Sequence, residues 1–367
     1  MRIVVPKETK AGELRVALVP DIISKLTKAG LEVIIESNAG RSAEYSDKQF
    51  SDAGAQVKSG DVLAESDVVL SVQPLTATQM KTLKKGAITI SFLSPSTSQD
   101  SIDAAVSAGV TAISLEMVPR ISRAQSMDAL TSQALCAGYK ASLVAAELSP
   151  KFFPLLMTAA GTVTPAKVVV LGAGVAGLQA IATAKRLGAV VSAYDVRPSS
   201  ADEVKSMGAT FIDLELEALE GSGGYAREMS EERAAKQREL LTPYITKSHV
   251  LITTAAVPGR AAPMLVTKQM YQAMAPGSVI VDLAAESGGN VEGSKPGEVI
   301  TVGNSVLLWG GKDVPSQLPF HSSYLLSRNM VNLLLLMVKD GAVAPDFSDE
   351  IIDASALTHG GNLRKGS

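Results

Sequence analysis

The sequence is poor in the side chains that bind metals or form disulfides. Its 367 residues include one cysteine, Cys136, and three histidines, His249, His321 and His359. A single cysteine excludes an internal disulfide and is typical of a reducing compartment. Four such residues, this far apart, do not form the spacing of a metal site, so we expect no bound metal.

Long hydrophobic runs and clusters of positive charge are also missing. The apolar run at 330–338 is interrupted by Asn332 and is far shorter than the roughly 20 residues of a membrane-spanning helix. The N-terminus, MRIVVPKETK, lacks the apolar core of a signal peptide. The net charge is −3 and the basic residues are scattered, unlike a nucleic-acid surface. We therefore expect a soluble chain with no direct membrane insertion and no nucleic-acid partner.

Aromatic residues are few as well. They make up 4% of the chain, whereas 46% of its residues are hydrophobic and 19% are charged. Such a composition is typical of a globular α/β protein whose cores are aliphatic and rich in alanine. The length suffices for two domains of ordinary size, each with its own core.

The first third of the chain alternates short apolar runs with helical segments. We expect a helix at 21–29, after Pro20 and before Gly30, and strands at 2–6, 31–36, 67–72, 87–93 and 110–116. Strands that recur with helical connections indicate βαβ units and a parallel sheet. No glycine fingerprint follows the first strand, so this half does not by itself indicate nucleotide binding.

The same rhythm restarts after a long helix expected at 129–147. We expect strands at 167–171, 190–195, 210–212, 249–254, 278–282 and 299–302, and a last apolar helix at 321–338. The pattern predicts two Rossmann-like, doubly wound parallel-sheet domains, joined by long helices, with a cofactor cleft between them. The first would comprise 1–128 and 320–367, and the second 129–319.

A dinucleotide fingerprint opens the second half. The buried-strand pattern 167–171 runs directly into Gly172, Gly174 and Gly177, and a helix is expected at 178–187. The first glycine makes the tight turn, the second lets a pyrophosphate approach the backbone, and the third lets helix and strand pack closely. The helix N-terminus then offers N–H groups to the phosphates. Alone, a glycine-rich turn of this kind can also be structural.

An acidic residue stands where the fingerprint requires it. Asp195 lies 21 positions after Gly174 and ends the second strand. A carboxylate there accepts hydrogen bonds from the adenosine ribose and repels a 2′-phosphate, which favours NAD(H) over NADP(H). Arg197 is either a partner for such a phosphate or a solvated loop charge.

Three loops carry further candidate residues. Arg120 to Asp128 concentrates polar side chains and could bind a nicotinamide and its ribose, or be a linker in which Asp128 caps the next helix. Gly221 to Tyr225 is glycine-rich and could close over a ligand, or be a surface loop before a helix at 226–241. Thr253 to Ala256 follows a Rossmann strand, where a turn commonly flanks the nicotinamide.

Several of these segments resemble one family. Val5 to Lys10 with Glu13 to Pro20 resembles the start of the alanine dehydrogenase and nicotinamide nucleotide transhydrogenase superfamily. Pro119 to Asp128, Gly224 to Ala226 and Val281 to Gly289 resemble the transhydrogenase branch, and the resemblance covers nearly the whole chain. It implies the NAD(H)-binding alpha component of a proton-translocating NAD(P)+ transhydrogenase.

The resemblance also implies an assembly. Hydride would pass between NAD(H) on this chain and NADP(H) on a partner subunit, coupled to protons crossing a membrane-embedded subunit. Because the sequence ends at Ser367 without a spanning helix, it would be the split-subunit form. We expect a homodimer in the cytoplasm, peripheral on the inner face of the membrane through its partners.

The resemblance also assigns roles to individual residues, through the motifs that this chain shares with the family. The resemblance places Gln125 beside the dihydronicotinamide, and Arg120 and Asp128 at its nicotinamide end. The remaining positions are Thr131 as a supporting hydroxyl, Gly174 and Val175 at the pyrophosphate, Asp195, Val196 and Arg197 at the adenosine ribose, Gly224 and Tyr225 in a mobile loop, and Gln237 and Ala256 near the cofactor. Gln125, Asp128, Arg120 and Tyr225 would form the catalytic group.

Two other functions compete. Alanine dehydrogenases, the sister family, resemble this chain at Arg15 but need a lysine and a histidine where it has Gln73 and Ser94. Because neither side chain titrates near neutral pH, amino-acid oxidation is not expected, and Arg15 becomes a structural or ion-paired residue. Direct transfer between two nicotinamides needs alignment and exclusion of water rather than a protein acid. The third hypothesis is a non-catalytic NAD-sensing module.

Overall fold

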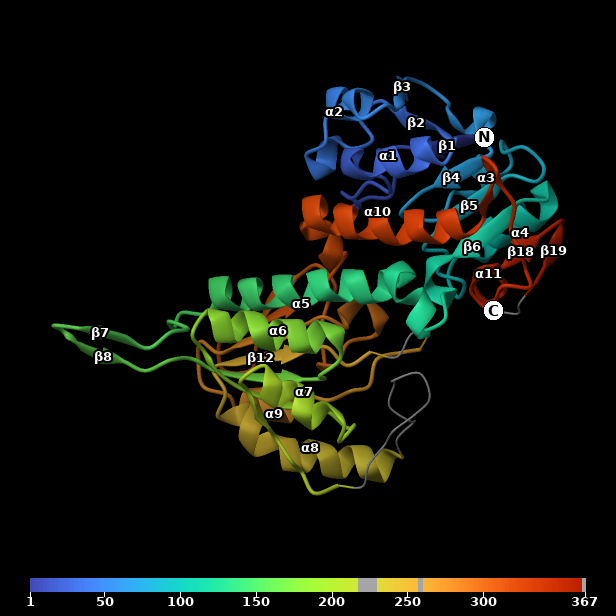
Figure 1. Cartoon of the computed structure of the whole chain (residues 1–367). Coiled ribbons are helices and arrows are strands. Elements are labelled where there is room, and N and C mark those ends of the chain that lie inside the picture. The colour runs from blue at the N-terminus through green and yellow to red at the C-terminus, as the bar shows by residue number, and fades with distance from the viewer. Residues whose placement is uncertain (217–229, 257–259, 365–367) are drawn as a thin grey trace. The chain divides into compact units, whose positions relative to one another are not determined.

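The computed structural model describes residues 1–216, 230–256 and 260–364. The chain divides into two compact units (Figure 1). Unit 1 comprises Met1–Gln133 and Pro315–Ser367, and unit 2 comprises Ala134–Val314. The chain passes from unit 1 to unit 2 within helix α5 (Ala129–Leu148).

Unit 1 is built on a six-stranded parallel sheet. Its strands lie in the order β3-β2-β1-β4-β5-β6. They are β1 (Arg2–Val5), β2 (Glu32–Glu36), β3 (Gln56–Lys58), β4 (Val68–Leu70), β5 (Ile88–Ser91) and β6 (Thr111–Ser114). The helices are α1 (Pro20–Lys28), α2 (Asp47–Asp52), α3 (Ala77–Met80), α4 (Gln99–Ala108), α10 (Pro319–Leu336) and α11 (Glu350–Ser355). Two short hairpins, β16 (Val338–Lys339) with β17 (Ala342–Val343) and β18 (Thr358–His359) with β19 (Asn362–Leu363), follow α10 and α11.

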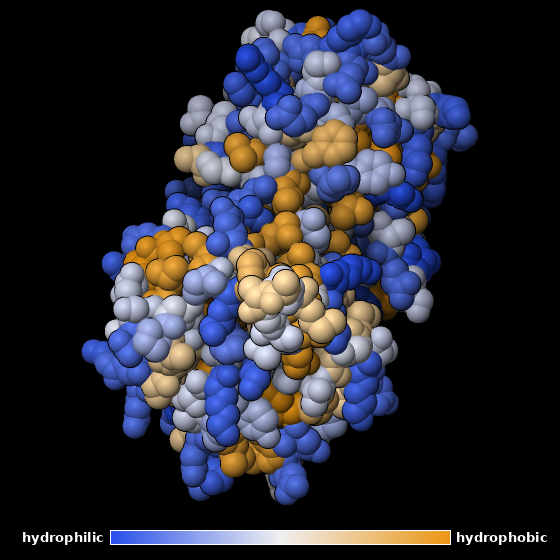
Figure 2. Space-filling model, turned by 90° about the vertical axis from the view of Figure 1, so that its left-hand side faces the viewer, coloured by the Kyte–Doolittle hydropathy of each residue, from blue (hydrophilic) through white to orange (hydrophobic). Residues whose placement is uncertain are grey.

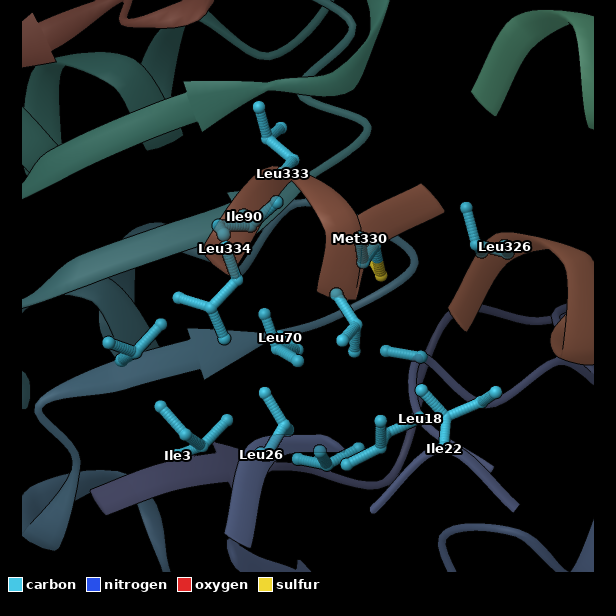
Figure 3. Close-up of a cluster of buried hydrophobic side chains, with 14 of the residues drawn as sticks. Ile3, Leu18, Ile22, Leu26, Leu70, Ile90, Leu326, Met330, Leu333 and Leu334 are labelled. Atoms are coloured by element: carbon cyan, nitrogen blue, oxygen red, sulfur yellow. The ribbon is translucent and has the colours of Figure 1, made fainter. Parts of the chain in front are cut away.

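Alternate residues of these strands fill two separate cores. Ile3 packs on one face of the sheet and Val4 on the other, as the two-residue period of a strand requires. Figure 3 shows the first core, in which Leu26 of α1 and Leu334 of α10 meet the sheet. Since α10 is more than 300 residues after β1 in the sequence, the C-terminal segment completes the core of unit 1.

Unit 2 repeats the strand order and adds one strand. Its sheet runs β11-β10-β9-β12-β13-β15-β14. The strands are β9 (Lys167–Leu171), β10 (Val190–Tyr194), β11 (Thr210–Phe211), β12 (Val250–Thr253), β13 (Val279–Asp282), β14 (Val299–Val302) and β15 (Val306–Gly310). The helices are α6 (Val175–Arg186), α7 (Ser200–Ser206), α8 (Glu231–Thr246) and α9 (Lys268–Gln272). Both sheets therefore have the doubly wound order, which confirms the predicted fold class.

The edge of this sheet differs from the sequence-based prediction. Strand β14, expected in a parallel sheet, pairs antiparallel with β15, and β15 was not predicted. The two strands are joined by a short turn that includes Gly303, whose φ is +53°, and a tight turn can connect only antiparallel strands. Helix α6 also begins earlier than expected, at Val175, because Gly174 is its N-cap.

Helices cover both faces of the sheet of unit 2. Val168 and Val170 pack with α5 and α6, whereas Val169 and Leu171 pack with α8 and α9. A two-stranded hairpin, β7 (Leu156–Thr158) with β8 (Gly161–Val163), projects from this unit and was not predicted (Figure 1).

Helices α5 and α6 cross closely. A side chain at Gly138 of α5 would collide with the backbone carbonyl of Ala176, and Ser142 donates a 2.8 Å hydrogen bond to the carbonyl of Ala180. Such contact explains why small residues stand on the facing surfaces of the two helices.

Candidate functional site

The glycine turn after β9 has the geometry that its sequence predicts. Gly172 has a φ of +100°, a conformation that glycine adopts without strain, and its N–H donates to the carbonyl of Tyr194 on β10. A Cβ at Gly172 would lie 2.6 Å from Oγ1 of Thr254, and one at Gly177 would collide with the carbonyl of Gly172. Both positions therefore require glycine for packing alone.

Gly174 is different. It has an extended backbone, and a Cβ built on it has nothing within 4 Å among the described residues. Helix α6 starts at the next residue, and within the described part of the chain no side chain caps it. The structure therefore leaves open space at a helix N-terminus, where the backbone can bind phosphate oxygens. This cradle fits the pyrophosphate of a dinucleotide.

Asp195 joins this turn to the end of β10. Its carboxylate accepts a 2.7 Å hydrogen bond from the N–H of Ala173 and one of 2.9 Å from the N–H of Arg197. The guanidinium of Arg197 also pairs with it, Nε lying 2.8 Å from Oδ1. Arg197 is therefore the ion-pair partner of Asp195 rather than a free solvated charge, and its role towards a 2′-phosphate stays a prediction.

The polar loop of unit 1 forms a short helix, η4 (Ser122–Met127). Its backbone is held from α10, since the amides of Asn329 and Asn332 donate to the carbonyl of Ser126 at 2.9 and 3.1 Å. Arg123, which sequence reasoning did not assign, pairs with Asp349 at 2.6 Å. The loop is thus fixed at both its backbone and one arginine, while Arg120 and Gln125 remain exposed.

Asp128 caps helix α5. Its carboxylate accepts hydrogen bonds from the backbone N–H of Thr131 at 2.8 Å and from the Thr131 hydroxyl at 2.7 Å. The interpretation of Asp128 as an N-cap is confirmed. Thr131 therefore orients the carboxylate that the family resemblance places at the nicotinamide.

The remaining expected residues of unit 2 lie at two places. Gln237 is buried on α8 and accepts a 3.2 Å hydrogen bond from the hydroxyl of Tyr194, next to Asp195. Val196 follows Asp195 and is half-buried, and Ala256 is exposed three residues after β12. Gly224 and Tyr225, with the predicted closing loop, lie outside the described residues.

Unit 1 has a cavity of its own at the carboxyl ends of β1, β4 and β5. It measures about 530 Å³, and Glu8, Gln73 and Ser94 are among its lining residues. Burial raises the pKa of Glu8 to about 7, although the N–H groups of Val72 and Gln73 donate to its carboxylate. Sequence reasoning missed this group, whose pKa is raised chiefly by tertiary burial and to a smaller extent by the charge of Glu13.

Arg15 is buried and pairs with two side chains. Its guanidinium donates to Glu13 at 2.8 and 2.7 Å and to Oε1 of Gln133 at 2.8 Å. Although burial raises the pKa of Glu13, the hydrogen bonds and charge of Arg15 hold it below the ordinary value. Gln73 donates to the same carboxylate at 2.7 Å. The prediction that Arg15 is ion-paired is confirmed.

The described residues contain neither a spanning helix nor a metal cluster. None of their helices is long and apolar enough to cross a bilayer. Within the same residues, no group of three or more histidine, cysteine, aspartate or glutamate side chains could hold a metal ion.

Comparison with known proteins gives one family for both halves of the chain. Residues 4–137 match the alanine dehydrogenase/PNT N-terminal domain and residues 141–366 the alanine dehydrogenase/PNT C-terminal domain. The chain belongs to the alanine dehydrogenase/PNT family.

Three proteins of this family show where the chain stands within it. It is 44% identical to an alpha-subunit chain of the NAD(P) transhydrogenase of Rhodospirillum rubrum, over 99% of this chain and 97% of that protein. The crystal structure of transhydrogenase from Sinorhizobium meliloti matches with a TM-score of 0.90 at 42% identity, covering 99% of this chain and 100% of that one. Alanine dehydrogenase of Mycobacterium tuberculosis is 31% identical, over 99% of this chain and 94% of that protein. The chain is thus a homologue of transhydrogenase alpha subunits.

Proposed function

We propose that this chain is the NAD(H)-binding component of a proton-translocating transhydrogenase. It would exchange hydride between NAD(H) in unit 2 and NADP(H) on a partner subunit, coupled to proton movement through a membrane-embedded subunit. The observation that carries the proposal is the open cradle at Gly174, flanked by the carboxylate of Asp195, in a chain homologous to transhydrogenase alpha subunits. Nicotinamide supplies the hydride chemistry.

The residues of this chain would bind and align rather than react. Gly174 and Val175 would hold the pyrophosphate, and Asp195, Val196 and Arg197 the adenosine ribose. Exposed Arg120 and Gln125, with Asp128 oriented by Thr131, would hold the nicotinamide end. Such positioning groups suffice for direct transfer, which needs close alignment of two rings and exclusion of water.

Two observations favour this function over amino-acid oxidation. Gln73 and Ser94 line the unit 1 cavity, and they stand where an alanine dehydrogenase needs a lysine and a histidine. Gln73 also donates a hydrogen bond to the carboxylate of Glu13. Arg15, the candidate carboxylate ligand, is already paired with Glu13. A substrate carboxylate would have to displace a buried ion pair, at considerable cost.

The test is reconstitution. The chain is titrated with NADH and NADPH by calorimetry, and then mixed with an NADP(H)-binding partner subunit to follow single-turnover transfer between NADH and an NADP+ analogue. We expect NADH to bind at least about tenfold more tightly than NADPH, and transfer to require both chains. Binding without any transfer would favour the NAD-sensing module, and absence of NADH binding would refute the proposal.

We further propose that the chain works as a homodimer attached to the membrane through its partners. The support is the β7–β8 hairpin, in which the exposed fractions of Met157, Leu156 and Val163 are 77%, 36% and 41%. Figure 2 faces the side of unit 2 from which it projects, where hydrophobic residues gather. An isolated two-stranded hairpin is marginally stable in water, so a second copy of the chain is its proposed support.

Sedimentation tests the dimer. Replacing Met157 by lysine would place a charge in the interface, and we expect it to convert the dimer to a monomer. The matched control is Met207→Lys, at a residue of the same unit that is 40% exposed. A wild-type monomer, or an unchanged dimer in the Met157→Lys variant, would argue against this role of the hairpin.

A further inference from the structure

Asp282 is a fully buried carboxylate at the end of β13. It accepts hydrogen bonds from the hydroxyl of Thr253 at 3.0 Å and from the backbone N–H groups of Ala284 at 3.0 Å, Asn290 at 3.0 Å and Val291 at 3.3 Å. These donors compensate the buried charge. The contacts also tie the carboxyl end of β12 to that of β13 and fix the backbone at 290–291.

Asn290, also fully buried, uses its whole side chain on neighbouring backbone. Its Oδ1 accepts from the N–H of Ala255 at 3.0 Å, and its Nδ2 donates to the carbonyls of Ala255 and Pro263, both at 2.8 Å. One amide therefore holds both backbone groups of Ala255. Only asparagine offers an acceptor and two donors at this reach.

The segment that Asn290 holds lies against the glycine turn. The hydroxyl of Thr254 donates to the carbonyl of Gly172 at 3.0 Å, and a Cβ at Gly172 would lie 3.1 Å from the nitrogen of Ala255. A shift at Ala255 would therefore move Thr254 and Ala256 relative to this turn. Ala256, the next residue, is exposed.

We propose that Asn290 is a positioning residue for the nicotinamide half of the site, and that Asp282 holds Asn290 in place. The proposal rests on the proposed NAD(H) site. In a sheet of this order, the dinucleotide crosses between the β9–β10 half and the β12–β13 half. Asp195, after β10, serves the adenosine half, whereas Thr254 to Ala256 follow β12 and serve the other half. Asn290 acts on the second half alone.

Two ligands separate positioning from a general structural role. NADH reaches both halves of the site, whereas 5′-AMP reaches only the adenosine half. In the full chain, we expect Asn290→Ala to weaken NADH about tenfold while 5′-AMP affinity stays within about twofold of wild type. A merely structural role would leave the ratio of the two affinities unchanged. The matched control, Asn304→Ala in the exposed β14–β15 turn, should change neither affinity.

A second variant covers a failure of Asn290→Ala to fold. Thr254→Val keeps the shape of a half-buried side chain and removes its hydrogen bonds to the carbonyls of Gly172 and Leu171. As with Asn290→Ala, we expect this variant to bind NADH more weakly and to bind 5′-AMP as wild type does. Equal losses of both ligands, or unchanged NADH affinity in the folded variants, would overturn the inference. A wild-type chain that binds 5′-AMP and NADH equally well would overturn it too, whereas one that binds neither refutes the proposed function itself.

Discussion

The carboxylate of Asp195 accepts a hydrogen bond from the backbone N–H of Ala173, at 2.7 Å. Ala173 stands between the first two glycines of the turn, and Asp195 ends the neighbouring strand. One side chain therefore connects the proposed ribose site to the proposed pyrophosphate site. Because Arg197 pairs with the same carboxylate, a negative and a positive side chain meet at this point.

Removing the charge of Asp195 should reduce the preference for NADH. In an Asp195→Asn variant, no carboxylate repels a 2′-phosphate, and Arg197 loses its ion pair and becomes available to that phosphate. We expect the NADH-to-NADPH affinity ratio, measured by calorimetry, to fall by about tenfold, or roughly 1.4 kcal/mol. Asp100→Asn, the same change at an exposed residue of unit 1, should leave the ratio unchanged. An unchanged ratio in Asp195→Asn would contradict the assignment.

Alanine substitutions at two glycines of the turn should distinguish a loss of stability from a loss of NADH binding. Gly177→Ala should lower the free energy of unfolding by about 2 kcal/mol or more, since its Cβ would collide with the carbonyl of Gly172. Gly174→Ala, whose Cβ enters open space, should stay within about 0.5 kcal/mol of wild type but bind NADH at least about tenfold more weakly. Urea unfolding and calorimetry measure the two effects. A Gly174→Ala variant with wild-type affinity would exclude a pyrophosphate there.

Shortening Gln125 should affect transfer more than binding. Gln125→Asn retains the amide but withdraws it by one methylene, and a small misplacement at a reacting centre can cost on the order of a hundredfold in rate. NADH affinity should change little, because Gly174 and Asp195 still bind the rest of the molecule. Stopped-flow transfer with the partner subunit measures the rate, with Gln99→Asn, at an exposed position of α4, as control. Transfer at the wild-type rate would remove Gln125 from the proposed centre.

The chain should not oxidise L-alanine. Gln73 and Ser94 provide no acid or base for the deamination, and Arg15 is occupied by Glu13. The measurement is NADH formation from L-alanine and NAD+, followed by the absorbance of the reduced nicotinamide. Turnover at rates typical of enzymes, about 1 per second or faster, would show that Glu8 or another group replaces the missing pair.

Glu8 should make stability fall as the pH rises towards 7. Burial raises its pKa from 4.5 to about 7, so the folded chain holds a proton that the unfolded chain releases above pH 4.5. The stabilisation is complete below the unfolded pKa and is lost as the pH rises through about 7. Glu8→Gln, which cannot ionise, should gain stability relative to wild type across this window by about 3 kcal/mol. Urea unfolding midpoints of both proteins at several pH values measure this difference, and parallel pH dependences would contradict the raised pKa of Glu8.

Some features of this protein could be predicted from local sequence. The apolar strands, the acid at 195 and the glycines at 172, 174 and 177 have fixed spacings within a few tens of residues, so their structure follows from nearby chain. Asp128 could be interpreted as a cap for the same reason, since its partner, Thr131, is three residues away.

Other features depended on residues far apart in the chain. The antiparallel pairing of β14 with β15 was missed because short apolar runs do not reveal the direction of their partners. The raised pKa of Glu8 comes from burial, and the ion pair of Arg123 joins residues more than 200 positions apart. Neither leaves a signal in the local pattern.

The sequence by itself determined the two α/β halves and the residues of the dinucleotide fingerprint, because strand periodicity and glycine conformation are local properties. Only the tertiary structure decided which side chains hold those residues in place. Asn290 reaches Ala255 across 35 positions, and Asp195 reaches Ala173 across 22. Such hydrogen bonds form only after parallel strands have brought their carboxyl ends to one edge of the sheet, so the spacing of residues along the chain does not encode them.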